Sequence, residues 1–362
     1  MSLRLVISTG GTGGHVFPAL AVAQTLVRER PGTEVLFMGG QGPEGDMARK
    51  AGVPFMALPA QGVLGTGLGR LKAPLWLSQA LIRALWKLKN FKPSCVVGFG
   101  GYAGFCPPLA AWMLGLPTAV HEQNSVPGAV NRVLAKVVDR VFASFAASAG
   151  HFPAAKTTVT GNPVRPDIAA VGQTGKGRFG TNLLVLGGSQ GARAVNDLMA
   201  EAAPVLLDQG ASIRHQAGAA DAARVRELYI SRGLDPAPVT PFIEDMAGAY
   251  QWADLILCRA GASTVFEAAA AGRPCLFLPF PHATHDHQRH NAEAMTRAGG
   301  ALVLAQSGLT AKDLLTAVSP LLSDPGRLDS MSRAARDFAR PQAARDIALA
   351  VLQMAEAQRS RS

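Results

Sequence analysis

The 362-residue chain has little cysteine, few aromatic residues and no long hydrophobic run. Its four cysteines lie in apolar stretches without CxxC spacing, which predicts buried, reduced thiols in a cytoplasmic protein. No apolar run reaches the roughly 18–20 residues of a membrane-spanning helix, and we expect no signal peptide because the N-terminus lacks a basic region and a small-residue cleavage site. With 48% hydrophobic and 17% charged residues, the composition indicates a globular protein with room for two domains.

Acidic residues are absent from a long part of the first half, because none occurs between Asp46 and Glu122. Residues 1–162 carry 15 Lys and Arg against 6 Asp and Glu, whereas residues 163–362 carry 20 against 19. Within the acid-free part, residues 71–91 combine two tryptophans with basic residues, as interfacial membrane segments do. The pattern predicts an anionic partner, either nucleic acid or a membrane surface, although an amphipathic helix packed on its own sheet is equally compatible with it.

Two glycine-rich segments stand half a chain apart, and each follows an apolar run. The first is GGTGGH (10–15), after residues 3–8, and the second is GGSQGAR (187–193), after residues 183–186. A strand that ends in glycines and enters a helix presents bare backbone N–H groups to an anion, with the helix dipole behind them. The pair predicts two α/β domains that hold phosphate groups in a cleft between them.

Apolar runs alternate with helical patterns, which predicts a parallel sheet in each half. We expect strands at 3–8, 34–38, 95–98, 118–121 and 140–143, and then at 182–186, 212–216, 239–241, 255–258 and 275–279. The first helix is expected to begin near Pro18, and the chain to cross between domains at 161–166. A loop is expected at 172–180. The predicted domains are 1–162 and 163–340, with a C-terminal helix within 341–362 packing back on the first.

Three competing interpretations start from the same motifs. A dinucleotide site is disfavoured, because the first turn lacks GxGxxG spacing and no acidic residue closes the second strand. Gly187–Gly191 also fits the GxSxG nucleophile elbow, and Asp254 with a histidine from 282–290 would complete a hydrolase triad. The histidines of 282–290 suggest a metal site but have the wrong spacing.

The segment 259–267 predicts a further anion-binding turn, because small residues again follow a strand and lead into a helix with a hydroxyl available as N-cap. Glu267 lies about one turn into that helix. There its carboxylate can accept two hydroxyls of a sugar or ribose, although an acidic residue early in a helix also interacts favourably with the dipole.

The motifs together resemble the GT-B glycosyltransferases, in particular the bacterial enzymes that move N-acetylglucosamine from UDP-GlcNAc onto a lipid-linked muramyl-pentapeptide. The resemblance runs nearly end to end through GGTGGH (10–15), GFGGYAGFCP (98–107), HEQNSVPG (121–128), GNPVR (161–165), GGSQGAR (187–193), PFIEDM (241–246), RAGASTVFE (259–267) and PFPHATHDHQRHNA (279–292). It implies two Rossmann-like, doubly wound parallel-sheet domains facing a cleft, and an inverting transfer without a covalent sugar intermediate.

The resemblance also implies roles for individual residues. The donor UDP-GlcNAc would contact Thr12, Gly13, Gly14, Asn124, Arg165, Ser189, Ile243, Ala262, Ser263, Thr264, Val265, Phe266, Glu267 and Gln288. The acceptor would contact Gly10, Gly11, Gly13, Gly14, Gly100, Gly101, Tyr102 and Glu122. His15 is the candidate general base. No cofactor or protein-bound metal is expected, because helix N-termini can stabilise the leaving UDP.

A polyprenyl-anchored acceptor gives the basic stretch a role. The resemblance implies a peripheral protein at the cytoplasmic face of the bacterial inner membrane, docked through residues 70–92, with other cell-wall synthesis proteins as further partners. Nucleic acid is not expected as a partner, because no nucleic-acid-binding motif accompanies the charge. Two alternatives stay open at this stage: the α/β hydrolase using Ser189, and a nucleotide-sugar-binding protein without catalysis.

Overall fold

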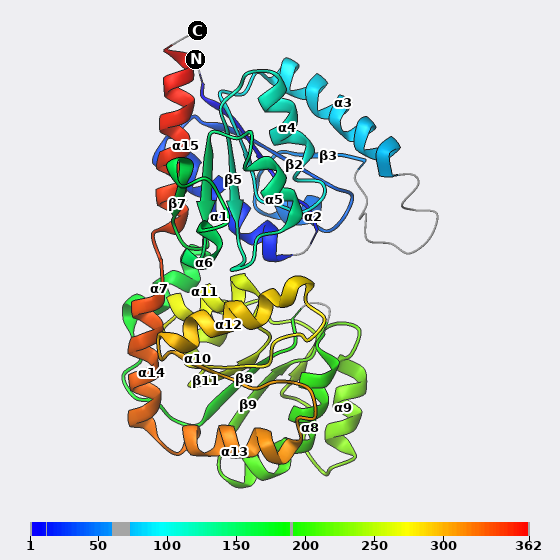
Figure 1. Ribbon diagram of the computed structural model, residues 1–362. Helices are drawn as coiled ribbons and strands as arrows, with labels where there is room; N and C mark the ends of the chain where they lie inside the picture. The colour runs from blue at the N-terminus through cyan, green and yellow to red at the C-terminus, as the bar shows by residue number, and fades with distance from the viewer. Residues whose placement is uncertain (1, 12, 60–72, 189–190, 361–362) are drawn as a thin grey trace. The chain divides into compact units, whose positions relative to one another are not determined.

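A computed structural model describes residues 2–11, 13–59, 73–188 and 191–360, without the side chains of residues 73 and 74. The chain forms two compact units, which are coloured along the sequence in Figure 1. Met1–Arg165 together with Arg340–Ser362 make the N-terminal unit, and Pro166–Ala339 make the C-terminal unit. Of the helices in the described ranges, none has the length and apolarity to cross a bilayer.

The N-terminal unit is built on a parallel sheet in the order β3-β2-β1-β4-β5-β6-β7. Its strands are β1 (Arg4–Ser8), β2 (Glu34–Gly39), β3 (Phe55–Ala57), β4 (Cys95–Gly98), β5 (Thr118–Glu122), β6 (Arg140–Ala143) and β7 (Thr157–Val159). Its helices are α1 (Gly13–Glu29), α2 (Glu44–Lys50), α3 (Ala73–Phe91), α4 (Cys106–Met113), α5 (Ala129–Leu134), α6 (Ala146–Ala149), the short η1 (Ala154–Lys156) and the C-terminal α15 (Ala343–Arg359). The strand order reverses between β1 and β4.

Side chains alternate between the two faces of this sheet, so the core of the unit is divided into two layers. Leu5 and Ile7 of β1 pack with α1 and α15, whereas Val6 between them packs with α3 and α4 on the other face. The C-terminal helix α15, red in Figure 1, lies against α1 and buries Ile347 and Val351 in the same cluster. The last residues of the chain therefore complete the unit that the first residues begin.

The C-terminal unit repeats the plan with a parallel sheet in the order β10-β9-β8-β11-β12-β13. Its strands are β8 (Asn182–Leu186), β9 (Ser212–Gln216), β10 (Val239–Thr240), β11 (Leu255–Cys258), β12 (Cys275–Phe277) and β13 (Ala301–Val303). Its helices are α7 (Pro166–Thr174), α8 (Arg193–Asp208), α9 (Ala222–Ile230), α10 (Met246–Trp252), α11 (Ala262–Ala270), the short η2 (Thr284–Asp286), α12 (His287–Arg297), α13 (Ala311–Leu322) and α14 (Pro325–Phe338). Here the order reverses between β8 and β11.

The expected two doubly wound, Rossmann-like sheets are present, and all ten predicted strands occur with ends within two residues. Three strands of three residues, β3, β7 and β13, were not predicted, because so short a segment has no readable periodicity. The first helix begins at Gly13 rather than near Pro18: proline is preferred in a first turn, but this helix accommodates it one turn later.

The expected loop at 172–180 is wrong in its first part, because α7 continues to Thr174 and includes Gly172. A Cβ at Gly172 would lie 1.9 Å from the carbonyl oxygen of Ala270, at the end of α11. Glycine is therefore required here by the close approach of two helices rather than by a loop.

Candidate functional site

Two glycine turns interlock at the carboxyl edge of the N-terminal sheet. One follows β1 at Gly10 and the other follows β4 at Gly100 and Gly101, so they meet where the strand order reverses. Gly101 has φ +75°, and a Cβ there would lie 2.1 Å from the carbonyl oxygen of Gly10. A Cβ on Gly10 would in turn lie 2.7 Å from that of Ala103. In doubly wound sheets, ligands bind at this switch point.

His15 lies in the first turn of α1, beside these turns, with its side chain partly exposed. Its Nδ1 is 3.0 Å from Oε1 of Gln123, which follows β5. The side-chain nitrogen of Gln123 in turn donates to the carbonyl of Phe99 and lies 3.1 Å from Nδ1 of buried His121. Burial lowers the pKa of His121 to about 4, so its ring is neutral near pH 7. Gln123 was not predicted as a site residue.

Glu122 is buried and organises the loop that follows β5. Its Oε1 accepts the N–H of Asn124 at 2.9 Å, and its Oε2 accepts the N–H of Gly128 at 3.1 Å and the side-chain amide of Asn131 at 2.8 Å. Both carboxylate oxygens are therefore engaged within the loop, which sets the position of Asn124. Tyr102 lies partly exposed after β4, and burial raises the pKa of its phenol.

The other predicted residues of this unit lie at the start of α1 and next to the chain crossing. Gly11 has φ +97° and is exposed, as is Gly14, whereas Gly13 packs beside Phe17. The guanidinium of Arg165 lies 5.0 Å from the centre of the Phe17 ring. Thr12 lies outside the described residues.

The second glycine turn follows β8 in the C-terminal unit and leads into α8. Gly188 and Gly191 have φ of +76° and +81°, a conformation that favours glycine, and Ser189 lies outside the described residues. Gly187 donates its N–H to the carbonyl of Gln216, and a Cβ there would lie 3.0 Å from Oδ1 of Asn196. The turn therefore rests directly on β9 and on a buried side chain of α8.

Asn196 is the centre of a buried polar network behind this turn. Its Nδ2 donates to the carbonyl of Ala217 at 2.9 Å and to Oδ2 of Asp221 at 2.7 Å, while its Oδ1 lies 3.1 Å from Nε2 of His215. Nδ1 of His215 lies 3.2 Å from the hydroxyl of Tyr229. Burial lowers the pKa of His215 to about 4, so the network holds a neutral imidazole.

Helix α11 begins at the carboxyl end of β11, the other strand at the switch point. Its N-cap is Gly261 without a side-chain cap, so the hydroxyl cap expected from the sequence is wrong. The first intrahelical bond runs from the N–H of Val265, which leaves residues 262–264 at the positive end of the helix. The side chains of Val265 and Phe266 are buried in the core, and Glu267, also buried, accepts a hydrogen bond from Tyr250 at 3.2 Å.

The segment after β12 is tied to the same edge of the sheet. Nη1 of Arg259 donates to the carbonyls of Leu278 and Pro279 at 2.8 and 3.2 Å, and burial lowers the pKa of this arginine. Gln288, in the first turn of α12, accepts the N–H of Phe280 at 3.0 Å. Buried Asn291 donates to Ala260 and so fixes the turn before α11.

The histidines of this segment do not form a metal centre in the described part of the chain, where no group of three His, Cys, Asp or Glu could hold an ion. His285 and Asp286 instead adopt left-handed φ near +54° and +53°, a costly conformation in residues other than glycine. Ile243, partly exposed after β10, lies at the same carboxyl edge as Gly187, Gly261 and Gln288.

The hydrolase interpretation of the GxSxG match fails on the position of Asp254. This buried residue immediately precedes β11 and accepts the N–H of Asn182, the first residue of β8, at 2.9 Å. It also pairs with Lys176 at 2.6 Å. Asp254 therefore lies at the amino edge of the sheet, whereas the turn that carries Ser189 follows the carboxyl edge, so the proposed triad cannot assemble.

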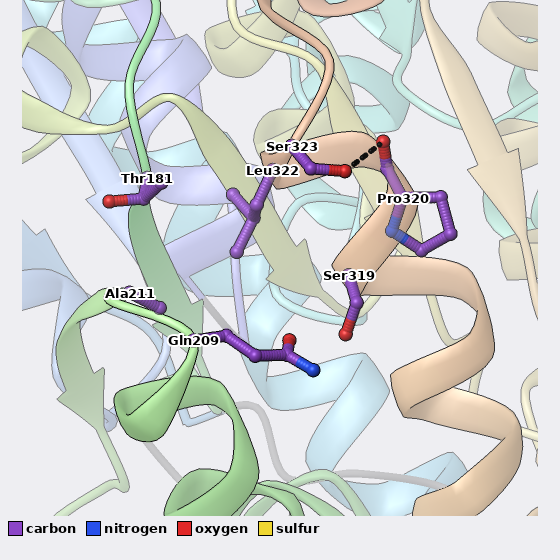
Figure 2. A pocket seen from close by; sticks show the side chains of 7 residues that line it. All are labelled: Thr181, Gln209, Ala211, Ser319, Pro320, Leu322 and Ser323. Atoms are coloured by element: carbon purple, nitrogen blue, oxygen red, sulfur yellow. Dashed lines mark hydrogen bonds between the residues drawn. The ribbon is translucent and has the colours of Figure 1, made fainter.

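A pocket of about 560 Å³ opens at that amino edge, away from every predicted site residue. Thr181 and Ala211, which precede β8 and β9, line it together with Gln209 and the end of α13. Figure 2 shows Ser323 bonded back to the carbonyl of Pro320, so this hydroxyl is engaged within its own helix end. The pocket is separate from the glycine turns.

Helix α3 carries an exposed apolar stripe. Leu75, Ile82 and Trp86 recur at helical spacing and are 60%, 64% and 65% exposed, while Ala80, Ala84 and Leu88 on the opposite face are buried. The helix packs against α4, whose Trp112 and Met113 are also exposed. Arg70 and Lys72, part of the predicted docking stretch, lie outside the described residues.

Comparison with known proteins matches both units to one family. The model of the glycosyltransferase family 28 N-terminal domain matches residues 5–143, and that of the glycosyltransferase family 28 C-terminal domain matches residues 182–347. The chain is 52% identical to the UDP-N-acetylglucosamine--N-acetylmuramyl-(pentapeptide) pyrophosphoryl-undecaprenol N-acetylglucosamine transferase of Solidesulfovibrio magneticus, over 97% of this chain and 98% of that protein.

Two further relatives support the same family assignment. A transferase of the same name from Nitratidesulfovibrio vulgaris strain DP4 is 48% identical, with 94% of each chain covered. The crystal structure of Acinetobacter baumannii MurG superposes with a TM-score of 0.76 at 35% identity, over 97% of this chain and 99% of that one.

Proposed function

The chain belongs to glycosyltransferase family 28, and from that premise we propose that it transfers N-acetylglucosamine from UDP-GlcNAc to the muramyl 4-hydroxyl of undecaprenyl-diphosphate-linked N-acetylmuramyl-pentapeptide. It is an enzyme of peptidoglycan synthesis. The observation that carries this proposal is the 52% identity with a transferase of that name along nearly the whole of both chains.

UDP-GlcNAc is the ligand that suits the carboxyl edge of the C-terminal sheet. The start of α8, which follows the turn at Gly188 and Gly191, and the start of α11 offer backbone N–H groups and helix dipoles to a diphosphate. Glu267, oriented by Tyr250, is suited to accept ribose hydroxyls, and Gln288 to reach the sugar. Because Val265 and Phe266 are buried, they would contact the donor through the main chain alone. Under this proposal the leaving UDP needs no metal ligand from the protein.

The acceptor diphosphate suits the interlocked turns of the N-terminal unit, at Gly10, Gly11, Gly100 and Gly101. His15 would remove the proton of the muramyl hydroxyl while its oxygen attacks the anomeric carbon and UDP departs with the bonding electrons, which inverts that carbon. Glu122 is better suited to position the loop than to act as the base, because three donors already occupy its carboxylate.

Membrane contact is the function that best suits the exposed stripe of α3. Leu75, Ile82 and Trp86 are apolar and accessible, and Arg83 and Lys87 lie on the same helix. Such a surface binds at the level of the lipid headgroups, with basic residues attracted to anionic lipids. We infer a peripheral protein at the cytoplasmic face of the inner membrane, where the lipid-linked acceptor is held.

The test is UDP release from UDP-GlcNAc in detergent, with the lipid-linked muramyl-pentapeptide and, as control, with a polyprenyl diphosphate that lacks the muramyl group. The proposal requires release that depends on the muramyl acceptor. Release without any acceptor would mean hydrolysis, and tight UDP-GlcNAc binding without release would mean a binding protein. Either result would overturn the proposal.

The role of His15 is tested separately with His15→Ala. Loss of the base should lower kcat by roughly 10²-fold or more while UDP binding stays nearly unchanged, because His15 is not among the predicted donor contacts. The matched control is His151→Ala, an exposed histidine of the same unit. A variant that retains most of its turnover would assign the base elsewhere.

A further inference from the structure

We infer that Gln123 is a positioning residue that holds His15 in the tautomer with the proton on Nδ1, so that Nε2 presents its lone pair. The inference rests on the proposed function for its consequence in catalysis. Its geometric basis is a chain of hydrogen bonds that runs from a main-chain carbonyl through two buried side chains to the ring of His15.

The chain begins at the carbonyl of Gly161. Nε2 of His121 lies 3.3 Å from that oxygen, and a carbonyl oxygen can only accept, so Nε2 carries the ring proton. The ring of His121 is buried and neutral, which leaves Nδ1 as an acceptor. The hydroxyl of Ser144, also 3.3 Å from Nε2, can share this proton as a second acceptor.

The next member, Gln123, is oriented by two acceptors. Its side-chain nitrogen lies 2.9 Å from the carbonyl oxygen of Phe99 and 3.1 Å from Nδ1 of His121. The amide group has two N–H donors, and both are used by these contacts. The reverse orientation of the amide would place its oxygen against two acceptors, so the oxygen must face His15.

The amide oxygen then determines the state of His15. Oε1 of Gln123 lies 3.0 Å from Nδ1 of His15 and can only accept, so Nδ1 is the protonated nitrogen. Among the described residues, this is the hydrogen bond made by the ring, which leaves Nε2 available to a substrate. Gly100 passes alongside, and a Cβ there would lie 3.3 Å from Nδ1, so a larger residue would disturb the pair.

A general base needs a lone pair aimed at the proton it removes. In a neutral histidine, the hydrogen bond made by one ring nitrogen decides which of the two nitrogens carries that lone pair. Among the titratable groups on the segments around this chain, His121 lies on β5, Glu122 ends that strand and Tyr102 follows β4. Glu122 is engaged by its own loop, and His121 is neutral. Gln123 therefore supplies the orienting contact without adding a charge.

The experiment measures the tautomer directly, by long-range ¹H–¹⁵N NMR of the full-length protein with labelled histidine, near pH 8 and with His15→Gln to assign the signal. We expect His15 to be protonated at Nδ1 in the wild type. Gln123→Met should shift it toward the Nε2-protonated form that a free imidazole prefers. Gln123→Glu keeps an acceptor for Nδ1 of His15 and should retain its proton, while its second carboxyl oxygen, as the protonated acid, faces the acceptors of Phe99 and His121. Gln353→Met, at an exposed position of α15, is the control.

Kinetics supply a second readout. Gln123→Met should lower kcat roughly tenfold or more with little change in the KM for UDP-GlcNAc. Gln123→Glu should recover part of that loss, because it restores an acceptor to Nδ1 of His15. A purely structural role would make both variants equally poor.

A wild-type His15 protonated at Nε2, or an unchanged tautomer in Gln123→Met, would overturn the inference. The NMR result does not depend on turnover, so it is distinguishable from failure of the proposed function, which would appear as a wild-type protein without acceptor-dependent UDP release. Should Gln123→Met not fold, the tautomer in the wild type and in Gln123→Glu still decides the matter.

Discussion

The neutral, buried His215 predicts that the C-terminal unit loses stability in mild acid. Burial lowers the pKa of its imidazole to about 4, and the nearby Asp221 only partly opposes that effect. In the unfolded chain the same group has its ordinary pKa of about 6.5. As pH falls below that value, the unfolded state takes up a proton that the folded state excludes until about pH 4, so acid favours unfolding.

The two pKa values fix the size of the effect. Linkage gives a fall of about 2 kcal/mol in the free energy of unfolding between pH 7 and pH 5, and about 3 kcal/mol by pH 4. This loss is large beside the roughly 5–15 kcal/mol of an ordinary domain. His121, whose pKa is also lowered to about 4, makes the same prediction for the N-terminal unit.

The assay is urea unfolding at pH 7 and pH 5, followed by hydrogen-exchange labelling pulses at one fixed pH. Peptides from β8 and β9 report the C-terminal unit separately. His215→Gln keeps a donor toward Asn196 and removes the titration, so the drop attributed to His215 should disappear even if the variant is less stable at pH 7. His151→Gln, at an exposed site, should leave the drop intact.

Two results would refute this reasoning. A C-terminal unit equally stable at pH 7 and pH 5 would mean that His215 titrates normally in the folded state. A fall of the same size in His215→Gln would mean that other groups cause the acid sensitivity.

Three further predictions follow from single contacts. Gly101→Ala should destabilise the N-terminal unit by roughly 3 kcal/mol or more in urea unfolding, because its Cβ would overlap the carbonyl of Gly10. Asn196→Ala should cost about 2–4 kcal/mol in stability and raise the KM for UDP-GlcNAc, because the glycine turn loses its support; an unchanged KM would contradict that role. The double variant Ile82→Ser and Trp86→Ser should bind anionic vesicles several-fold more weakly in flotation with normal UDP binding.

Long, strongly patterned segments were predictable from the sequence because their signal is local. Buried parallel strands such as 95–98 and 182–186 are short, mostly apolar runs that end in or just before glycine, and the structure reproduces their limits. The C-terminal helix expected within 341–362 is likewise present, as α15. The start of α1 was misplaced, because a proline at Pro18 is typical of a first turn and only the folded chain shows that the turn before it is already helical.

The candidate site was also only partly predictable from the sequence. The glycine turns and the residues that follow strands could be predicted as site residues from the sequence, because parallel strands bring their carboxyl ends to one edge of a sheet, where ligands bind. The supporting residues Gln123, Asn196 and Arg259 were missed as site residues, since an amide or a guanidinium gives no sign in the sequence of which carbonyl it will reach. Asp254 is an opposite case. The chain order Ser, Asp, His suggested a hydrolase triad, but the sheet places Asp254 at its amino edge, away from the glycine turn.

By itself the sequence determined the two α/β halves, their glycine turns and the concentration of positive charge in the first half, since each depends on residue type and short-range spacing. Tertiary structure alone decided that positions 101 and 172 must be glycine, because a Cβ at Gly101 would overlap the carbonyl of Gly10 and a Cβ at Gly172 would overlap that of Ala270. It also decided the protonation states of His121 and His215, because a pKa depends on the burial and the partners that distant segments provide. Those long-range contacts are set by packing, and no local pattern encodes them.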